Sequence, residues 1–316
     1  MKLTGKNKVI IILGPTSSGK SSLAVKLAKE FNGEIISVDS RQVFREMNLG
    51  TGKVEGVWKD GVYIYKNIPH YLIDFVEPEE EYNVSHFKRD CEEKIIEISE
   101  KGKTPILCGG TGFWIQAIVD DVEFPEIKPD LKLRKELKEK SLEELQKMIF
   151  ELDSERAATV DKKNKVRLIR AIEIAKKVGK VPKIETFKKE SAREIEGKEF
   201  EFLQIGIPVD KNKLLEKIKT RLEERFKDGM VEEISNLYQK HNLTPEKIQN
   251  LGIAYSLVPL FKKGELTREE LFEKIVLAEK KYAKRQMTWF QKDPRIKWEN
   301  NYEKIRELVA NFKKLD

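Results

Sequence analysis

Short apolar runs in the first third of the chain predict β-strands. The clearest is Lys8–Leu13 (KVIIIL), which is rich in β-branched residues and too short for a helix. Runs of this kind are typical of parallel strands that are buried on both faces. Further runs follow at Glu34–Val38, Tyr71–Val76 and Thr104–Cys108.

Helical periodicity separates these runs. Ser22–Phe31 places its apolar residues on one stripe, and a second helix is expected to start at Ser85 as its N-cap and to run to about Lys101. Strands and helices that alternate in this order predict an α/β fold with a doubly wound parallel sheet flanked by helices.

The pattern changes after about residue 120. Residues 131–177 have helical patterning, Phe200–Ile207 returns as a strand, and residues 210–293 are helical again. We therefore predict one core of residues 1–119 and 200–316, interrupted by an all-helical insertion of residues 120–199.

Charge singles out the insertion. The chain has 316 residues and a net charge of +7, and residues 128–190 hold 19 Lys and Arg against 12 Asp and Glu, which accounts for the whole surplus. A local basic excess favours a polyanionic partner. Two cysteines and three scattered histidines offer neither a disulfide framework nor a zinc pattern. We also expect no membrane span and no signal peptide, and hence a cytoplasmic protein.

A phosphate-binding loop follows the first strand. Gly14–Ser21 reads GPTSSGKS and matches G-x-x-x-x-G-K-[ST] between a strand and a helix, as a P-loop requires. Its glycines allow backbone N–H groups to surround phosphate oxygens, Lys20 adds a positive charge, and the Ser21 hydroxyl is a ligand for Mg²⁺. The motif alone leaves the ligand open between ATP, GTP and a diphosphate.

Polar residues follow the other predicted strands, where an open α/β sheet binds its ligands. Asp39 is either a general base, a magnesium ligand or a helix N-cap. Thr111, in the run GGTG, is either a phosphate donor or an N-cap. We interpret Asp74 as a structural acid rather than a second magnesium ligand, and Cys108 as apolar filling.

A basic helix is expected around Lys165–Lys177. Lys163, Arg167, Arg170 and Lys177 recur at helical spacing, and Val166, Ile169 and Ile172 occupy the opposite face. Such a helix is either an ordinary solvated surface or a face that lies along a phosphate backbone.

Together these motifs resemble the tRNA dimethylallyltransferase (tRNA isopentenyltransferase) family, bacterial type. The resemblance covers nearly the whole chain in order. Besides the P-loop it includes ISVDSRQVF at Ile36, GTGK at Gly50, HYLIDFVEP at His70, YNVSHFKRD at Tyr82, LCGGTGFWIQA at Leu107, NKVRLIRAIEI at Asn164, TRLEERFKDGM at Thr220 and KRQMTWFQKDPRIKW at Lys284.

The resemblance implies transfer of a dimethylallyl group from dimethylallyl diphosphate to N6 of the adenosine 3′-adjacent to the tRNA anticodon, with Mg²⁺ and release of diphosphate. It implies Asp39, Thr111 and Lys20 as catalytic residues, with Asp39 as the base and Thr111 as a donor to the leaving oxygen. The residues implied for the diphosphate are Gly14, Thr16, Ser17, Ser18, Gly19, Lys20, Ser21 and Arg221, with Ser21 on the metal. Those implied for tRNA are Asp39, Ser40, Arg41, Gln42, Thr111, Arg167, Arg170, Lys284, Arg285 and Gln286.

The insertion corresponds to the unit of that family that binds the anticodon stem-loop, and we expect a monomer. Two alternatives come from the residues alone. One is a P-loop kinase of a nucleotide or small metabolite, and the other is a non-catalytic RNA-binding NTPase module. A guanine-reading N-K-x-D motif is absent from the sequence, which argues against a switch-type NTPase.

Overall fold

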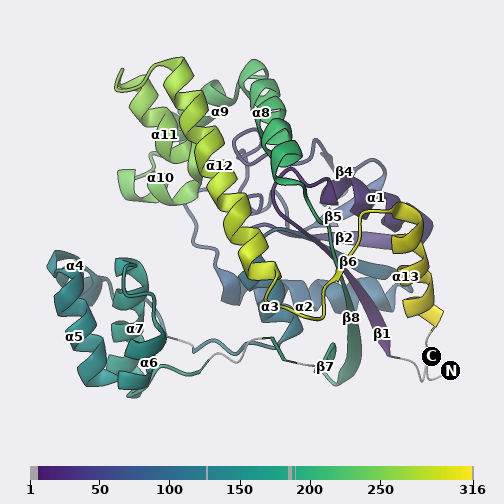
Figure 1. Ribbon diagram of the computed structural model, residues 1–316, viewed down its shortest axis with the longest axis horizontal. Helices are drawn as coiled ribbons and strands as arrows, with labels where there is room; N and C mark the ends of the chain where they lie inside the picture. The colour runs from purple at the N-terminus through teal and green to yellow at the C-terminus, as the bar shows by residue number, and fades with distance from the viewer. Residues whose placement is uncertain (1–5, 126, 184–186, 189, 315–316) are drawn as a thin grey trace. The chain divides into compact units, whose positions relative to one another are not determined.

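The computed structural model describes residues 6–125, 127–183, 187–188 and 190–314 (Figure 1). The chain divides into two compact units, a larger one of residues 1–121 and 187–316 and a smaller one of residues 122–186. The sequence placed the second boundary at residue 199. The structure moves it to 187 because the strand Ala192–Ile195 pairs with the sheet of the larger unit.

One sheet organises the larger unit, in the order β3-β4-β5-β2-β6-β1-β8-β7, and β9 pairs with β8. The central strands from β5 to β8 run parallel, and the predicted strand after the insertion does rejoin the sheet beside β1. The strands are β1 Asn7–Leu13, β2 Gly33–Val38, β3 Val57–Lys59, β4 Val62–Tyr65, β5 Ile68–Tyr71, β6 Thr104–Gly109, β7 Ala192–Ile195, β8 Lys198–Gly206 and β9 Lys297–Trp298.

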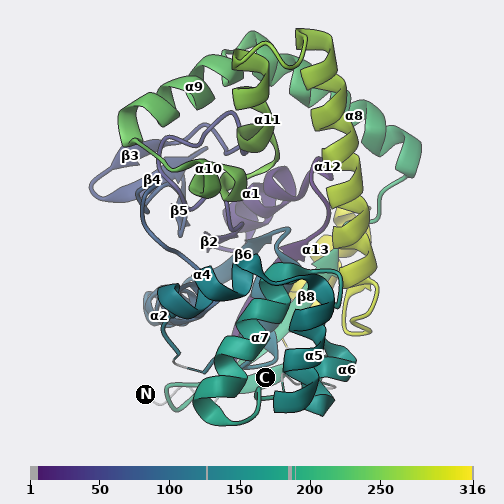
Figure 2. The ribbon, with the colours of Figure 1, turned by 90° about the vertical axis from the view of Figure 1, so that its left-hand side faces the viewer.

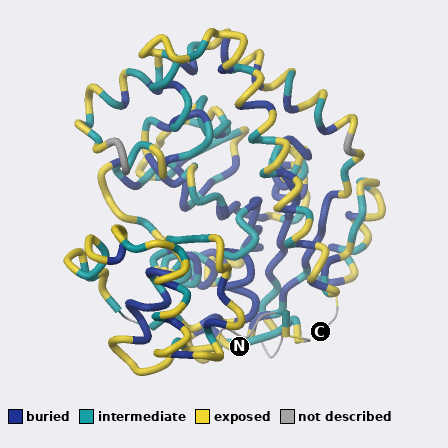
Figure 3. Tube along the Cα trace, turned by 60° about the vertical axis from the view of Figure 1, so that its left-hand side comes forward, coloured by how far each residue is buried: buried dark blue, intermediate teal, exposed yellow. Residues whose placement is uncertain are grey.

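Helices cover both faces of this sheet, as the doubly wound prediction requires. Ile10 and Ile12 of β1 pack into a cluster with α1 and α13, whereas the alternate residues Val9 and Ile11 join a second cluster with α2, α3 and α8–α12. The helices of this unit are α1 Lys20–Glu30, α2 Val84–Glu100, α3 Gly112–Val119, α8 Lys211–Lys227, α9 Met230–His241, α10 Pro245–Leu251, α11 Ile253–Lys262, α12 Arg268–Phe290 and α13 Tyr302–Lys314. Figure 3 shows the central strands as a buried layer.

Two local predictions were wrong. The expected strand Tyr71–Val76 ends at Tyr71, because Leu72 and Asp74 adopt positive φ of 54° and 55°, which breaks an extended strand. The helix expected from Ser85 is capped instead by Asn83, whose side chain accepts hydrogen bonds from the backbone N–H groups of Ser85 and His86.

The smaller unit is all-helical (Figure 2). Its helices are α4 Leu131–Glu139, α5 Leu142–Leu152, α6 Ser154–Thr159 and α7 Lys165–Val178. Leu137, Leu145, Ile149, Leu168 and Ile172 are buried together and form its own core. This unit therefore has the elements of an independently packed insertion.

Candidate active site

The P-loop curls at the carboxyl end of β1 and leads directly into α1. Ser17 and Gly19 adopt positive φ of 60° and 92°, a turn that keeps the loop backbone tight, and Gly19 occupies the N-cap position of α1. Lys20 is the first residue of the helix, and its Nζ donates to the carbonyl of Pro15 at 3.1 Å. The loop therefore has the closed form that surrounds a phosphate group.

The burial of the Lys20 ammonium group favours binding of an anion beside it. Burial lowers its pKa, and the charge of Asp39 partly offsets this effect. Cys108 itself packs among apolar residues, and burial raises the pKa of its thiol to about 11, which leaves it protonated at neutral pH. An ammonium group that burial disfavours gains most from a bound diphosphate.

Asp39 lies near the P-loop because β2, β6 and β1 are parallel neighbours whose ends align, with Gly109 opposite both Val38 and Leu13. Its Oδ1 accepts hydrogen bonds from the N–H groups of Arg41 at 2.9 Å and Gln42 at 3.3 Å. Asp39 thus caps a turn and is not the N-cap of a helix. Both of these hydrogen bonds are to Oδ1. Within the described residues Oδ2 accepts no hydrogen bond, so it stays available to a ligand.

Thr111 occupies the N-cap position of α3, yet its hydroxyl does not cap that helix. Its Oγ1 accepts a hydrogen bond from the backbone N–H of Ser40 at 3.2 Å and also bonds to the Tyr282 hydroxyl. Burial and the charge of Asp39 raise the pKa of Tyr282 to about 12. Tyr282 was not singled out in the sequence, where a single tyrosine in a helical stretch carries no motif.

Gln286 of α12 fastens the two loops of the site to each other. Its Oε1 accepts from the N–H of Thr16 and its Nε2 donates to the carbonyl of Gly110, both at 2.9 Å. Gln286 is buried, whereas Lys284 and Arg285 on the same helix are exposed and Arg285 lies over the Tyr282 ring. The resemblance assigned three residues of α12 to tRNA binding. Of these, Gln286 connects the two loops, whereas Lys284 and Arg285 are surface cations.

Two arginines of α8 complete the cationic side. Arg221 donates from Nη1 to the Ser17 hydroxyl at 3.1 Å, and burial together with the charge of Arg225 lowers the pKa of Arg221. Arg225 pairs with Glu279 of α12 at 2.5 Å. Arg221 thus contacts the P-loop, whereas Arg225 is held by Glu279.

Most of these groups share one cavity of about 450 Å³ in the larger unit, a size typical of small-ligand sites. Thr111 and the P-loop residues Gly14, Ser17, Ser18 and Gly19 do not line it. The predicted residues that line it are Thr16, Lys20, Ser21, Asp39, Ser40, Arg41, Gln42, Arg221, Arg285 and Gln286. It also contains residues that no motif had singled out, including Gly50–Gly52, Arg225, Tyr255, Glu279 and Tyr282. The structure thus brings the P-loop lysine and the candidate base Asp39 to the same space.

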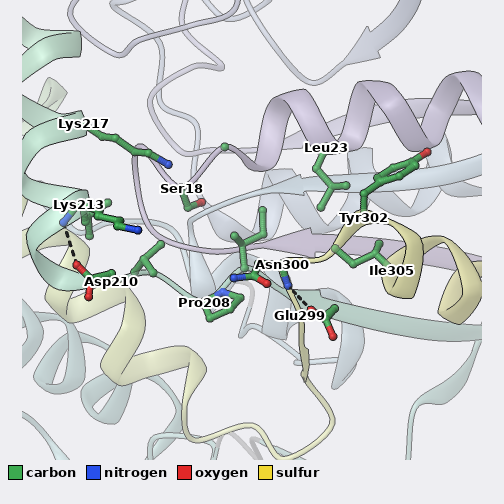
Figure 4. A pocket seen from close by; sticks show the side chains of 14 residues that line it. Ser18, Leu23, Pro208, Asp210, Lys213, Lys217, Glu299, Asn300, Tyr302 and Ile305 are labelled. Carbon is green, nitrogen blue, oxygen red and sulfur yellow. Dashed lines mark hydrogen bonds between the residues drawn. The ribbon is translucent and has the colours of Figure 1, made fainter.

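Ser18 and Gly19 instead line a second cavity, of about 410 Å³, on another side of the P-loop. Figure 4 shows Lys213 and Lys217 of α8 extending toward Ser18, opposite Tyr302 and Ile305. Its lining includes neither Asp39 nor Thr111. This second space therefore has phosphate-compatible charge without the candidate base.

Asp74 does not reach the site. Its carboxylate binds Lys53 Nζ at 2.5 Å and the Trp58 indole N–H at 2.8 Å. The interpretation of Asp74 as a structural acid therefore agrees with its contacts.

The basic helix of the smaller unit differs in detail from its prediction. Asn164 caps α7, so Lys163 precedes the helix rather than lying on its face, and Val166, expected to be packed, is 77% exposed. Arg170 is partly internal, since it pairs with the buried Glu173 and donates to the Ile127 carbonyl at 3.0 Å. Arg167 projects outward, with its side chain 64% exposed.

The oxygen groups of the site fit a magnesium ion, which in phosphate sites takes one or two protein oxygens and completes its shell with phosphate and water. Ser21 lines the cavity together with the Asp39 carboxylate. The described residues contain no cluster of three or more His, Cys, Asp or Glu side chains that would hold a metal without phosphate. None of the helices in the described ranges has the length and apolar character that crossing a membrane requires.

Comparisons with known proteins agree on one family. Residues 42–293 match the family model described as IPP transferase, and residues 7–57 match the one described as Isopentenyl transferase. The chain is 40% identical to the tRNA dimethylallyltransferase 2 of Shewanella sediminis, over 90% of this chain and 89% of that protein. It is 37% identical to the tRNA dimethylallyltransferase of Thermoanaerobacter sp. strain X514, over 96% and 97%.

Solved structures give the same result. The tRNA isopentenylpyrophosphate transferase of Bacillus halodurans matches with a TM-score of 0.67 and 29% identity, over 98% of this chain and 96% of that one. The tRNA delta(2)-isopentenylpyrophosphate transferase of Staphylococcus epidermidis matches with a TM-score of 0.67 and 31% identity, over 98% and 100%.

Proposed function

This chain belongs to the IPP transferase family, and we propose that it transfers a dimethylallyl group from dimethylallyl diphosphate to N6 of the adenosine 3′-adjacent to the anticodon of tRNA. The observation that carries the proposal is the single cavity lined by both Lys20 of the P-loop and the carboxylate of Asp39. Diphosphate departure and removal of a proton from the amine need these two kinds of group within reach of one substrate pair.

The donor end of the reaction is electrostatic. As the bond between the allylic carbon C1 and the diphosphate oxygen breaks, the electron pair leaves with the diphosphate and its negative charge grows. Lys20, Arg221 and the N–H groups of the P-loop are preorganised around that position. Preorganised donors of this kind lower a barrier by about 3–4 kcal/mol each in other enzymes.

Thr111 belongs to the same end. Its Oγ1 accepts from the Ser40 N–H, and we assign the Tyr282 hydroxyl as a second donor to the same oxygen, which leaves the Thr111 proton for another acceptor. We assign that acceptor as the bridging oxygen of the leaving diphosphate. Thr111 then stabilises the oxygen on which charge develops first.

The acceptor end requires a base. The lone pair of the adenine amine is delocalised into the ring, so the amine becomes an effective nucleophile only as it loses a proton. N6 forms the new bond to C1, and its proton passes to the Asp39 carboxylate. Because Oδ1 is engaged by the Arg41 and Gln42 N–H groups, we assign Oδ2 as the proton acceptor. The adenosine reaches this depth as a flipped base.

We assign the metal site to the Ser21 hydroxyl and the donor diphosphate. When bound there, Mg²⁺ neutralises charge on the diphosphate and favours its departure. The exposed cations Arg167, Lys284 and Arg285, with Ser40–Gln42, are the tRNA contacts that we propose. Binding of the anticodon stem-loop by the smaller unit, the monomeric state and the cytoplasmic location remain predictions.

A transfer assay tests the proposal. Purified protein, Mg²⁺ and labelled dimethylallyl diphosphate should place label on unmodified tRNA, and digestion should recover it as N6-dimethylallyladenosine. A tRNA with guanosine at the target position serves as the control and should stay unlabelled. Transfer of label from the γ-phosphate of ATP to a small molecule, with none from the prenyl donor, would instead establish a kinase.

A further inference from the structure

The loop Asn48–Lys53, between β2 and β3, forms a wall of the cavity. Gly50, Thr51 and Gly52 line it from the side that faces Arg221 and Arg225. The loop contributes backbone rather than charged side chains at these positions, so its effect on the site depends on where the backbone is held.

Glu233, in the first turn of α9, holds one end of this loop. Its carboxylate accepts backbone hydrogen bonds from Asn48 at 3.2 Å, Leu49 at 2.8 Å and Gly50 at 3.0 Å. Hydrogen bonds to an ionised acceptor are roughly twice as strong as neutral ones. Tyr255 of α11 reinforces the arrangement: its hydroxyl is 3.4 Å from Glu233 Oε1, and a Cβ on Gly50 would lie 2.4 Å from that hydroxyl oxygen.

The other end of the loop meets the arginines. A Cβ on Gly52 would lie 2.7 Å from Arg221 Nη2, so the backbone there is in direct contact with the guanidinium group. Arg225 donates to the Leu49 carbonyl at 3.4 Å. Arg221 in turn donates to Ser17 of the P-loop. A continuous set of contacts therefore runs from Glu233 through the loop and Arg221 to the phosphate cradle.

We propose that Glu233 is a positioning residue for the transfer reaction: by holding the Asn48–Lys53 loop it keeps Arg221 directed at the diphosphate. This inference rests on the proposed function, because it assumes that a diphosphate occupies the P-loop. Glu233 does not line the cavity and acts only through the loop. Its loss should therefore weaken diphosphate binding and slow transfer.

The test uses Glu233→Gln in the full-length protein. Glutamine keeps the size of the side chain but removes its charge and turns an NH₂ group toward backbone N–H donors. The Kd for inorganic pyrophosphate with Mg²⁺ should rise about tenfold, the change expected from losing charge-assisted hydrogen bonds. Glu232→Gln is the matched control, since Glu232 is the exposed neighbour in the same helical turn.

A double-mutant cycle with Arg221→Lys identifies the route. If Glu233 acts through Arg221, the effects of the two substitutions on the pyrophosphate Kd are not additive. A Glu233→Gln protein that binds pyrophosphate like the Glu232→Gln control, or effects that add fully, would overturn the inference. Failure of the wild type itself to bind pyrophosphate would instead count against the proposed function.

If Glu233→Gln does not fold, Gly52→Ala tests the second part of the route, from the loop to Arg221. It leaves Glu233 intact but adds a methyl group against Arg221 at a backbone φ of 62°, which disfavours alanine. The same rise in the pyrophosphate Kd is expected, and an unchanged Kd would contradict the proposal.

Discussion

At the scale of single residues, the Asp39 carboxylate combines a structural contact with the chemistry that we propose for it. Oδ1 holds the turn through the N–H groups of Arg41 and Gln42, and Oδ2 remains for the substrate. The sequence left Asp39 open between a capping residue and a base. A capping contact and a base role are compatible here, because they use different oxygens of the carboxylate. The carboxylate caps a turn with one oxygen and offers the other to the cavity.

Asp39→Asn separates these two roles. The amide oxygen of asparagine can still accept from the turn, but the side chain no longer takes a proton. Turnover should fall by at least about a hundredfold, with the pyrophosphate Kd nearly unchanged. Single-turnover transfer and pyrophosphate titration measure the two quantities. Asp39→Ala, which also frees the turn, should impair both, and an Asp39→Asn protein with wild-type turnover would remove Asp39 as the base.

At the scale of elements, α12 stabilises the site because its Gln286 side chain connects the P-loop to the GGTG turn. Gln286→Leu would leave the Thr16 N–H and the Gly110 carbonyl without their partners. An unsatisfied buried polar group costs about 1–3 kcal/mol, so the free energy of unfolding should fall by about that amount for each group. Urea denaturation measures the loss. Lys284→Leu is the control, since Lys284 is an exposed residue of the same helix. Equal stability of the two variants would show that the Gln286 bonds contribute nothing.

Helix α7 gives a second prediction, because two of its arginines are in different environments. Arg167 is exposed, so Arg167→Gln should weaken tRNA binding and reduce the slope of log K against log salt by about 1. Arg170 pairs with the buried Glu173, so Arg170→Gln should mainly destabilise the smaller unit. Binding titrations over a salt series and thermal unfolding distinguish the two effects. An unchanged salt slope for Arg167→Gln would place the tRNA contact elsewhere.

The elements also show what the sequence was able to predict. The P-loop, β1, β2 and β6 follow from apolar runs and a motif with fixed spacing, and they position Lys20, Ser21, Asp39 and Thr111. The hairpin β3–β4 was missed, although its Asp60-Gly61 turn, with both residues at positive φ, is a known hairpin signal. Glu233 and Tyr282 had no local signal at all. Their roles arise from packing of helices that lie far along the chain from the P-loop, and a single sequence does not contain that packing.

At the scale of the whole molecule, His241 joins distant segments of the larger unit in a pH-dependent way. Its Nδ1 lies 2.6 Å from Glu79 Oε1 and its Nε2 lies 3.3 Å from Glu46 Oε2. Burial lowers the pKa of His241, but the hydrogen bonds to Glu79 and Glu46 outweigh it and raise the pKa above 6.5. A raised pKa in the folded state means that protonation stabilises the fold.

The stabilisation by His241 should therefore be complete below pH 6.5 and lost as pH rises through the raised pKa of the folded state. The difference in unfolding free energy between the wild type and His241→Gln should shrink as pH rises from 6.5 through the raised pKa of the folded state. Denaturant unfolding of both proteins over a pH series measures this difference. Subtracting the variant's free energy removes the contribution of the other titrating groups. A difference that stays constant or grows with pH would contradict this assignment.

The insertion itself is the last feature of the whole molecule to test. The Phe187 N–H donates to Asp120 Oδ2 at 2.7 Å, and both residues belong to the larger unit, so the two ends of the insertion leave and re-enter the core at neighbouring points. Replacing residues 122–186 by a short Gly-Ser linker should therefore leave the core folded, with the pyrophosphate Kd changed by no more than about twofold. Affinity for tRNA should fall and depend less on salt, because the removed residues 122–186 hold 17 Lys and Arg against 13 Asp and Glu. A linker variant that binds tRNA as tightly as the full chain would show that the anticodon stem-loop is held by the core alone.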